Sequence, residues 1–378
     1  MPTLIDRYLL RQFIEVLVIC FMSMIGLYIV IDAFGHLDHF VDYGEKHGGM
    51  LKILVSFYAY RSLEFFNQTS GVLTLIALMF TVTWIQRHNE MTALMAAGIT
   101  RFRVLRPVIM AAMLVSLLAA ANRELVLPNI RQQLSLDSKN LGGEQLASLQ
   151  SRFDSQTDIL LGGDKIVLAE EKIVGPKFQL PRGLDIYGKQ LSAYEARFLP
   201  AHDNLPSGYL LSGVITPKAL LTQPSLIKDG TPVVVTPADA DWLKPHQVFV
   251  PSGVSFEFLS AGASWREFAS TPELIRELRS PSTDLGADVR VAIHSRFLQP
   301  FLDTTLLFLG LPFVVTRSNR NPFLAIALCL CIVTIFMVVV LGCQSLGSSG
   351  WLQPALASWL PLILFAPLAA GMSETLRQ

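Results

Sequence analysis

The sequence predicts a membrane α-helical protein with six transmembrane helices, three on each side of an inserted extracytoplasmic β domain. Of its 378 residues, 51% are hydrophobic and only 16% are charged. The mean hydropathy of +0.45 is too high for a soluble protein of this length. The apolar residues gather into long blocks in both terminal parts of the chain. Between these blocks the charged residues return and short β-type runs appear.

Three apolar segments precede the β region. The first covers residues 13–31, the second ends with the uncharged run 65–86, and the third covers residues 107–122. Each is about as long as a helix that crosses a bilayer. The first is too long for a cleaved signal peptide, and no small-residue cleavage site follows it. Pro128 is expected to end the third helix, because proline removes a backbone donor.

Residues 129–293 are predicted to form the β domain. Short runs rich in β-branched and aromatic residues are bounded there by Gly, Pro and Asp. These runs are DILLG, DKIVLAEEKIV, GLDIYG, LSAYEARFL, GYLLSGVI, TPVVVTP and VFVPSGVSFEFL. About eight short strands without a long helix predict a sandwich or a jellyroll. One short helix, STPELIRELRS, should follow, with Ser270 or Thr271 as its cap and Pro272 in its first turn.

The remaining three spans are expected in the last part of the chain. The fourth covers residues 297–316 and carries a lone Asp303, and residues 321–373 contain no charged side chain. Glycines and a proline divide that apolar stretch into spans at 322–341 and about 355–371. The predicted domains are therefore residues 1–128 with helices one to three, 129–293 with the β domain, and 294–378 with helices four to six.

The basic residues predict the orientation. With a cytoplasmic N-terminus, the short inner segments hold nine basic residues and the short outer segments hold three, as the positive-inside rule requires. The inner nine are Arg7, Arg11, Arg87, Arg101, Arg103, Arg106, Arg317, Arg320 and Arg377, and the outer three are Lys46, Lys52 and Arg61. The β domain is too long to count. Both termini should then be cytoplasmic, with the β domain on the other side.

The segment between the second and third spans, about residues 86–100, is predicted to be a short cytoplasmic helix. Glu90, Leu94 and Gly98 recur at four-residue intervals, and two methionines lie beside them. Gly98 is a plausible stop for a helix of two to three turns. An acidic residue with methionines and small alanines suits a groove on another protein, which favours a docking helix that passes motion to the spans. The alternative is an amphipathic turn on the lipid surface.

Other polar residues give weaker signals. Asp32, His36 and His39 would share one helical face if the helix continues through Gly35. They would then form either an acidic and histidine-containing site where a lipid head group enters, or simply the solvated outer end of the first span. Asp303 would face a partner or cavity, because an ionisable group inside a span is costly, or it would stay wet near the outer interface.

Several activities find no support in the sequence. The segment 183–189 fits the start of a phosphate-binding loop, but Gln190 stands where Ser or Thr must hold magnesium, so we reject that motif. Any ATP must then be hydrolysed by another polypeptide. Zero net charge gives no reason to expect nucleic acid as a partner. The four cysteines suggest neither a disulfide framework nor a metal site, and no catalytic cluster supports an intramembrane enzyme.

The chain resembles the permease subunits of the lipopolysaccharide exporter, the LptF/LptG family. The most specific resemblance is QRHNEMTALMAAGITR, which is similar to the coupling-helix pattern of that family. Supporting segments along the chain are IDRYLLRQF, LVLP, DKIVLAEEKI, IYGKQLSAYEA, HSRFLQPF and SGWLQPALASWLPLILF. The resemblance covers essentially the whole length.

The resemblance implies an ABC-type exporter in the bacterial inner membrane. Two permease chains, a heterodimer or a homodimer, would sit on a cytoplasmic ATPase dimer that holds ATP and magnesium, and this chain would bind no cofactor. Glycolipid would enter between the spans and leave through a periplasmic jellyroll to a bridge of similar jellyrolls. The implied ATPase contacts are Arg87, Glu90, Met91, Leu94, Met95 and Gly98.

Residues of the lipid pathway are expected at Asp32, His36, Arg123, Arg131 and Asp303. Asp32 stands where some members of the family have a basic residue suited to lipid phosphates, and the two arginines are candidates to replace that residue. A different interpretation is a membrane scaffold that binds periplasmic partners through the β domain and transports nothing.

Overall fold

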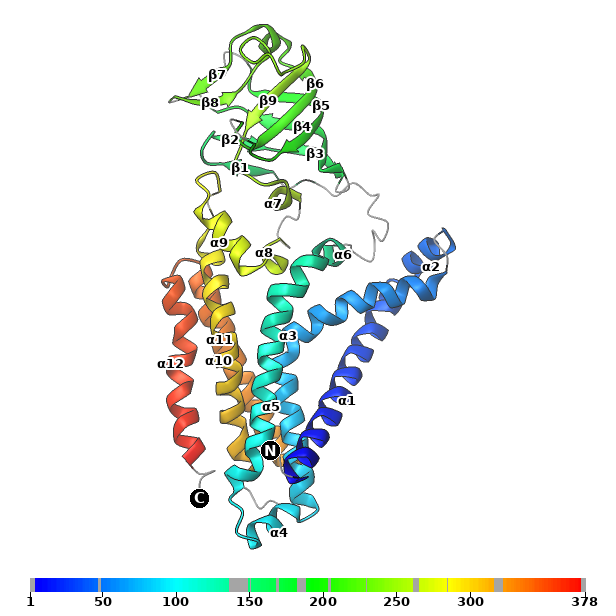
Figure 1. The fold of residues 1–378 in the computed structure, drawn as a ribbon, viewed down its shortest axis with the longest axis vertical. Coiled ribbons are helices and arrows are strands. Elements are labelled where there is room, and N and C mark those ends of the chain that lie inside the picture. Colours follow the sequence, from blue (N-terminus) through cyan, green and yellow to red (C-terminus); the bar gives the residue numbers. More distant parts are fainter. Residues whose placement is uncertain are drawn as a thin grey trace. The chain divides into compact units, whose positions relative to one another are not determined.

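A computed structural model describes most of the chain and divides it into two units. One unit combines Met1–Leu134 with Gly286–Gln378, and the other is Ser135–Leu285. The first is helical and the second is built mainly of strands (Figure 1). The described residues are 4–374 without 47–48, 136–148, 150, 168–169, 182–187, 203–204, 229, 261–264, 284 and 316–321.

Long helices make up the first unit. They are α1 (Leu4–Gly35), α2 (Leu37–Lys46), α3 (Met50–Arg87), α4 (Glu90–Ala96), α5 (Arg101–Ala121), α6 (Arg131–Ser135), α10 (Ala287–Val315), α11 (Pro322–Ser348) and α12 (Pro354–Ser373). In the described part, five helical segments are long and apolar enough to cross a membrane. They lie in α1, α3, α5 with its extension to Ile130, α11 and α12.

The fourth predicted span falls in α10. This helix has 29 residues, with Asp303 near its middle, and is not one of the five such segments found among the described residues. The count of six spans therefore stays a prediction. The fold class itself, apolar membrane helices with an inserted antiparallel β domain, is confirmed.

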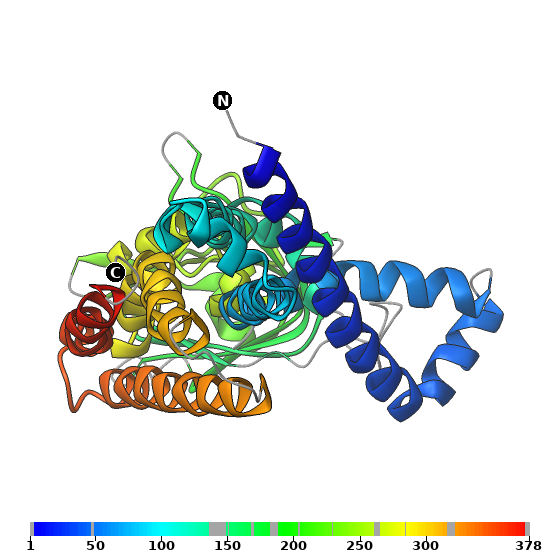
Figure 2. The ribbon, with the colours of Figure 1, turned by 90° about the horizontal axis from the view of Figure 1, so that it is seen from below.

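Helix α3 is longer than predicted and it bends. Its 38 residues begin at Met50, well before the uncharged run. Figures 1 and 2 show that the half next to α2 runs sideways, whereas the other half runs beside α5. Within α3, the hydroxyls of Thr69 and Thr74 donate to the carbonyls of Phe65 and Ser70, four residues earlier. Such bonds from hydroxyl groups to the helix backbone favour bending without a proline.

The predicted break at Pro128 is wrong. After α5 the chain continues as a π-helical turn, Asn122–Val126, and then as a 3₁₀ turn, Leu127–Ile130. Pro128 lies at the start of the 3₁₀ turn, where its missing N–H costs no intrahelical bond. The helix therefore continues here as π-helical and 3₁₀ turns instead of ending. Rare π-turns occur often at functional positions.

The core of the helical unit is formed mainly by α3, α5 and α10. Its buried side chains include Leu78, Val108 and Leu306. Helix α1 contributes Leu9 and Phe13 near its start, but most of its apolar side chains beyond Phe13 are exposed. Exposed apolar residues on a long helix suit contact with lipid or with another membrane helix.

The second unit contains an antiparallel sheet of seven strands with the order β1-β2-β4-β5-β6-β9, in which β3 also pairs with β4. The sheet is curled, and a separate hairpin is formed by β7 and β8 (Figure 1). The strands are β1 (Arg152–Asp154), β2 (Ile159–Leu161), β3 (Gly163–Val167), β4 (Lys172–Gln179), β5 (Gln190–Leu199), β6 (Gly208–Thr216), β7 (Leu226–Lys228), β8 (Thr231–Val234) and β9 (Gln247–Pro251).

Every predicted β run that lies in the described residues contains a strand, with one partial exception. The end of VFVPSGVSFEFL forms the helix α7 (Phe256–Ser260) instead of a continued strand. Most of the GLDIYG run, residues 183–187, lies outside the described residues. Alternate residues such as Phe178, Leu191 and Tyr209 are buried on the inner face of the sheet, as the two-residue period of a strand requires.

Three short helices follow the strands: α7, α8 (Trp265–Phe268) and α9 (Thr271–Arg279). Helix α9 confirms the predicted cap. The Ser270 hydroxyl accepts a hydrogen bond from the backbone N–H of Glu273, and the Glu273 carboxylate accepts one from the backbone N–H of Ser270. Pro272 lies in the first turn, where it is tolerated.

Candidate functional site

The predicted docking segment contains a helix of only seven residues, α4. It begins at Glu90 and not near residue 86, because α3 continues to Arg87 and Asn89 then adopts a left-handed conformation with φ of 57°. Gly98 ends the helix as predicted, with φ of 81°. The Ile99 N–H donates to the Leu94 carbonyl and the Gly98 N–H to the Met95 carbonyl, the two bonds of a Schellman motif.

Helix α4 has a buried face and an exposed face. Met91 is only 5% exposed and belongs to the core of the helical unit, and Leu94 packs against that core. Both therefore attach α4 to the unit and are turned away from the surface. Met95 is 37% exposed, and the small residues Ala93 and Ala96 are exposed beside it. Fewer residues are thus open to a partner than the predicted set contains, because Met91 and Leu94 face the core.

Polar contacts hold the ends of α4. The Tyr8 hydroxyl of α1 donates to the Glu90 carboxylate at 3.2 Å. The Arg101 guanidinium lies 3.2 Å from the Met95 sulfur. Arg87 is exposed at the end of α3. Glu90 is therefore half-buried and already bonded to the first helix, a contact that spacing within residues 86–100 could not reveal.

Asp303 lies in the interior of the helical unit. Its carboxylate accepts hydrogen bonds from the Ser116 hydroxyl of α5 at 2.8 Å and from the Gln299 amide at 3.0 Å. Gly71 of α3 lies so close that an added Cβ would come within 2.5 Å of an Asp303 oxygen. The carboxylate thus joins three helices. A cavity of about 10 Å³, which fits a single water, is lined by Gly71, Thr74, Ala112, Met113, Ser116, Asp303, Thr304 and Leu307.

Arg123 lies in the π-helical turn after α5. Its guanidinium donates to the Asn67 side chain of α3 at 3.3 Å, and its charge interacts with that of Asp303. The neighbouring Asn122 donates its amide to the Leu63 carbonyl at 2.9 Å. Both contacts attach the π-turn to α3. Arg131, the other basic candidate, begins α6 and is half-buried.

Asp32 and His36 lie together at the end of α1, but the predicted continuous helical face is wrong. The helix ends at Gly35 and a new helix begins at Leu37, so His39 belongs to α2. His36 Nδ1 lies 3.0 Å from the backbone carbonyl of Asp32. The Tyr58 hydroxyl of α3 donates to the Asp32 carboxylate at 2.8 Å. Asp32 therefore ties α1 to α3.

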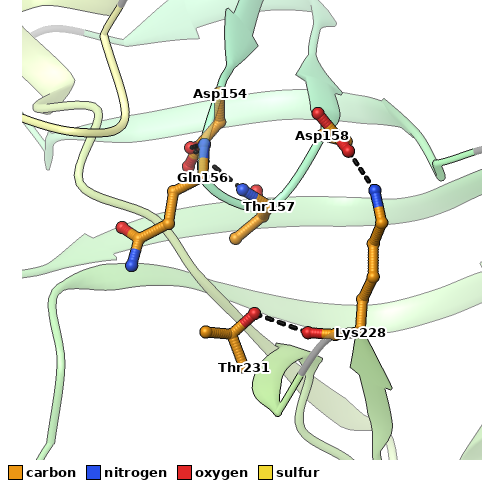
Figure 3. Close-up of polar contacts among 6 residues, drawn as sticks. All are labelled: Asp154, Gln156, Thr157, Asp158, Lys228 and Thr231. Carbon is orange, nitrogen blue, oxygen red and sulfur yellow. Dashed lines mark hydrogen bonds and ion pairs between the residues drawn. The ribbon is translucent and has the colours of Figure 1, made fainter.

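The β unit contains a buried polar cluster that sequence reasoning missed. Asp154 is fully buried and accepts hydrogen bonds from the backbone N–H groups of Gln156 and Thr157 at 2.9 and 3.3 Å (Figure 3). The Ser252 hydroxyl donates to the same carboxylate at 2.5 Å. An Asp at the start of the polar run DSQTD is a turn signal, which could have pointed to this loop.

An ion pair lies beside that turn. Lys228 of β7 reaches the Asp158 carboxylate, as Figure 3 shows, and thereby connects the β7–β8 hairpin to the β1–β2 turn. Thr231 donates to the Lys228 carbonyl at 2.7 Å. These contacts are structural. Among the described residues, no group of three or more His, Cys, Asp or Glu side chains is arranged to hold a metal ion.

The comparisons with known proteins agree with this architecture. A family model described as lipopolysaccharide export system permease LptF/LptG matches residues 7–170 and 244–374. These two segments cover most of the chain, including α4, the π-turn and Asp303. No curated protein matches the chain. The chain therefore belongs to the LptF/LptG family, the permeases of the lipopolysaccharide export system.

Proposed function

We propose that this chain is one permease subunit of an ABC-type exporter. It takes lipopolysaccharide or a similar glycolipid from the inner membrane and passes it to a periplasmic bridge protein of jellyroll type. A cytoplasmic ATPase dimer, which holds the ATP and magnesium, drives the transport, and a second permease subunit completes the pathway. Membership of the family makes the chain a transport component and supports this proposal.

The observation that carries the proposal is the construction of α4. It is a short helix between two long apolar helices. Met91 attaches it to the core of the helical unit, and the opposite face, with small residues around Met95, is exposed. A groove on a partner can accept such a face, because small side chains allow close approach. The buried side chains then transmit a push on α4 to α3 and α5.

The proposed orientation follows from the basic residues. Arg87, Arg101 and Arg103 flank α4, which argues for a cytoplasmic position of this helix and of both termini. The β unit is inserted between α6 and α10, so it would then be periplasmic. Arg123, Asp303, Asp32, His36 and Arg131 are proposed to shape the polar part of the lipid route. Asp303 and Asp32 would act through the helix contacts that they already make.

The test is the charge reversal Glu90→Arg. We expect ATPase binding to weaken at least about tenfold and glycolipid transport to be lost, because a reversed charge at a protein contact costs more than about 1.4 kcal/mol. The measurements are co-purification of the ATPase with the complete complex and ATP-dependent release of glycolipid from proteoliposomes. The matched control is Asp241→Arg, which reverses an exposed acidic charge in the β unit.

Unchanged assembly and transport in Glu90→Arg would refute the coupling role of α4. A wild-type complex that binds periplasmic jellyroll proteins but neither binds an ATPase nor moves glycolipid would support the scaffold interpretation instead.

A further inference from the structure

The first turns of α1 differ from the rest of that helix. Ile5, Leu9 and Phe13 lie at four-residue intervals on one face, and the last two are 1% and 0% exposed in the helical core. Beyond Phe13 one face of the helix is exposed, with Ile19 at 65%, while Phe21 contacts the rings of Phe65 and Phe66 in α3. The start of α1 is therefore packed in the core of the unit, and its middle packs on α3 along one face only.

Two polar contacts join this same start to the segment around α4. The Tyr8 hydroxyl donates a hydrogen bond at 3.2 Å to the carboxylate of Glu90, the first residue of α4. Asp6, only 9% exposed, lies 3.5 Å from the Arg103 guanidinium in the first turn of α5. One contact holds the beginning of α4 and the other the beginning of the next helix. The start of α1 thus contacts both the first residue of α4 and the first turn of α5.

We propose that Tyr8 and Asp6 are positioning residues that couple α4 directly to α1. This inference rests on the proposed function, in which a partner ATPase moves α4. A displacement of α4 then reaches α1 through Tyr8 and Glu90, in addition to its path along the chain into α3 and α5. Because α1 is one continuous helix from Leu4 to Gly35, a shift at its start is carried along its axis to the other end.

At its C-terminal end, α1 can pass this displacement on to α3. There the helix contacts α3 again, through the bond from Tyr58 to Asp32 and through the stacked rings of Tyr28 and Phe65, whose centroids are 5.5 Å apart. Helix α1 is therefore attached at both ends, and between them it exposes one face, which includes Ile19 and Met22. A push at the α4 end reaches the other end as a movement of one rigid rod, since a helix resists compression along its axis.

The experiment uses the complete complex of this chain, its ATPase and its permease partner in proteoliposomes. Tyr8→Phe removes only the hydroxyl. We expect glycolipid moved per ATP hydrolysed to fall about threefold, the size of effect typical of an exposed hydrogen bond to a carboxylate. Asp6→Asn, which removes a buried charge beside Arg103, should lower the same ratio. The control is Tyr28→Phe, which removes a hydroxyl from the same helix and keeps the stacked ring.

A double-mutant cycle separates coupling from a general loss of packing. If Tyr8 acts through Glu90, Tyr8→Phe adds nothing to the defect of Glu90→Gln. Equal transport per ATP in Tyr8→Phe and wild type, with the ATPase bound and active, overturns this inference alone. Defects that add in the double variant overturn it too. Failure of the wild-type chain to bind an ATPase overturns the proposed function beneath it.

Discussion

The two units each contain a buried or partly buried carboxylate, and they satisfy it in different ways. Asp154 in the β unit receives two backbone N–H groups of its own turn and one hydroxyl from Ser252. Asp303 in the helical unit receives side-chain donors only, Ser116 from α5 and Gln299 from α10. Backbone donors of the same turn cannot leave the carboxylate without unfolding the loop. A hydroxyl on a neighbouring helix can leave when the helices shift.

This difference indicates what each unit is built to do. The Asp154 cluster fixes the β1–β2 turn to β9, and the Ser282 hydroxyl adds a bond to the Gln156 side chain at 3.1 Å. These bonds hold the β1–β2 turn, Ser252 and Ser282 together. The Asp303 contacts join α3, α5 and α10 across a small cavity, which suits helices that move relative to one another. The following predictions test this contrast.

The largest expected effect is that of Asp154→Ala. It leaves buried donors of Gln156, Thr157 and Ser252 without their acceptor and should destabilise the β unit by about 3–5 kcal/mol, because each unsatisfied buried group costs about 1–3 kcal/mol. The matched control is Asp158→Asn, which removes the charge of the surface pair with Lys228, keeps a residue type that tolerates the φ of 55° at this position, and should cost less than about 1 kcal/mol. Hydrogen exchange of strands β5 and β6 in the full chain measures both. Equal effects of the two variants would contradict the contrast.

An intermediate effect is expected for Gly71→Ala. The added methyl group would meet an Asp303 oxygen at 2.5 Å and displace it from Ser116, at a cost of about 1–3 kcal/mol. The control is Gly26→Ala in α1, where nothing lies within 4 Å of an added Cβ. Thermal unfolding in detergent compares them. If Gly71→Ala is as stable as its control, the helices do not meet tightly at Asp303.

The smallest effect concerns pH. Burial raises the pKa of Glu277 in α9 above its ordinary value of 4.5, although the Ser255 hydroxyl donates to its carboxylate at 2.8 Å. A raised pKa means that the folded state binds the proton more tightly, so this group destabilises the β unit as pH rises above 4.5. Glu277→Gln should therefore gain stability relative to wild type between pH 4 and pH 8, measured by unfolding at both values. A constant difference would show that Glu277 does not titrate differently on folding.

Local patterns in the sequence predicted much of the fold. The apolar blocks predicted the long helices, and the β-type runs predicted the strands. As predicted, the capping box at Ser270 begins α9 and Gly98 ends α4. Each of these depends on residues within a few positions of one another. The π-turn at Asn122 was missed, because it is held by a partner on another helix, the Leu63 carbonyl that accepts a hydrogen bond from the Asn122 side-chain amide.

The candidate site was harder to predict for the same reason. Tyr8 and Glu90 are 82 positions apart, and Ser116 and Asp303 are 187 apart, so no spacing rule could pair them. The sequence identified Glu90 and Asp303 as unusual residues, but it could not name their partners. It also did not separate the buried Met91 from the exposed Met95, since a helix of seven residues gives too few turns to define a face.

The bend in α3 has a consequence for the size of the helical unit. A straight helix of 38 residues measures about 57 Å along its axis, whereas a bilayer with its head groups is about 45 Å thick. Unbent, α3 would protrude into water with apolar residues such as Leu51 and Val55 uncovered. The bend turns part of this length sideways (Figure 1), so the helix extends less far along any one direction than a straight helix of 38 residues would.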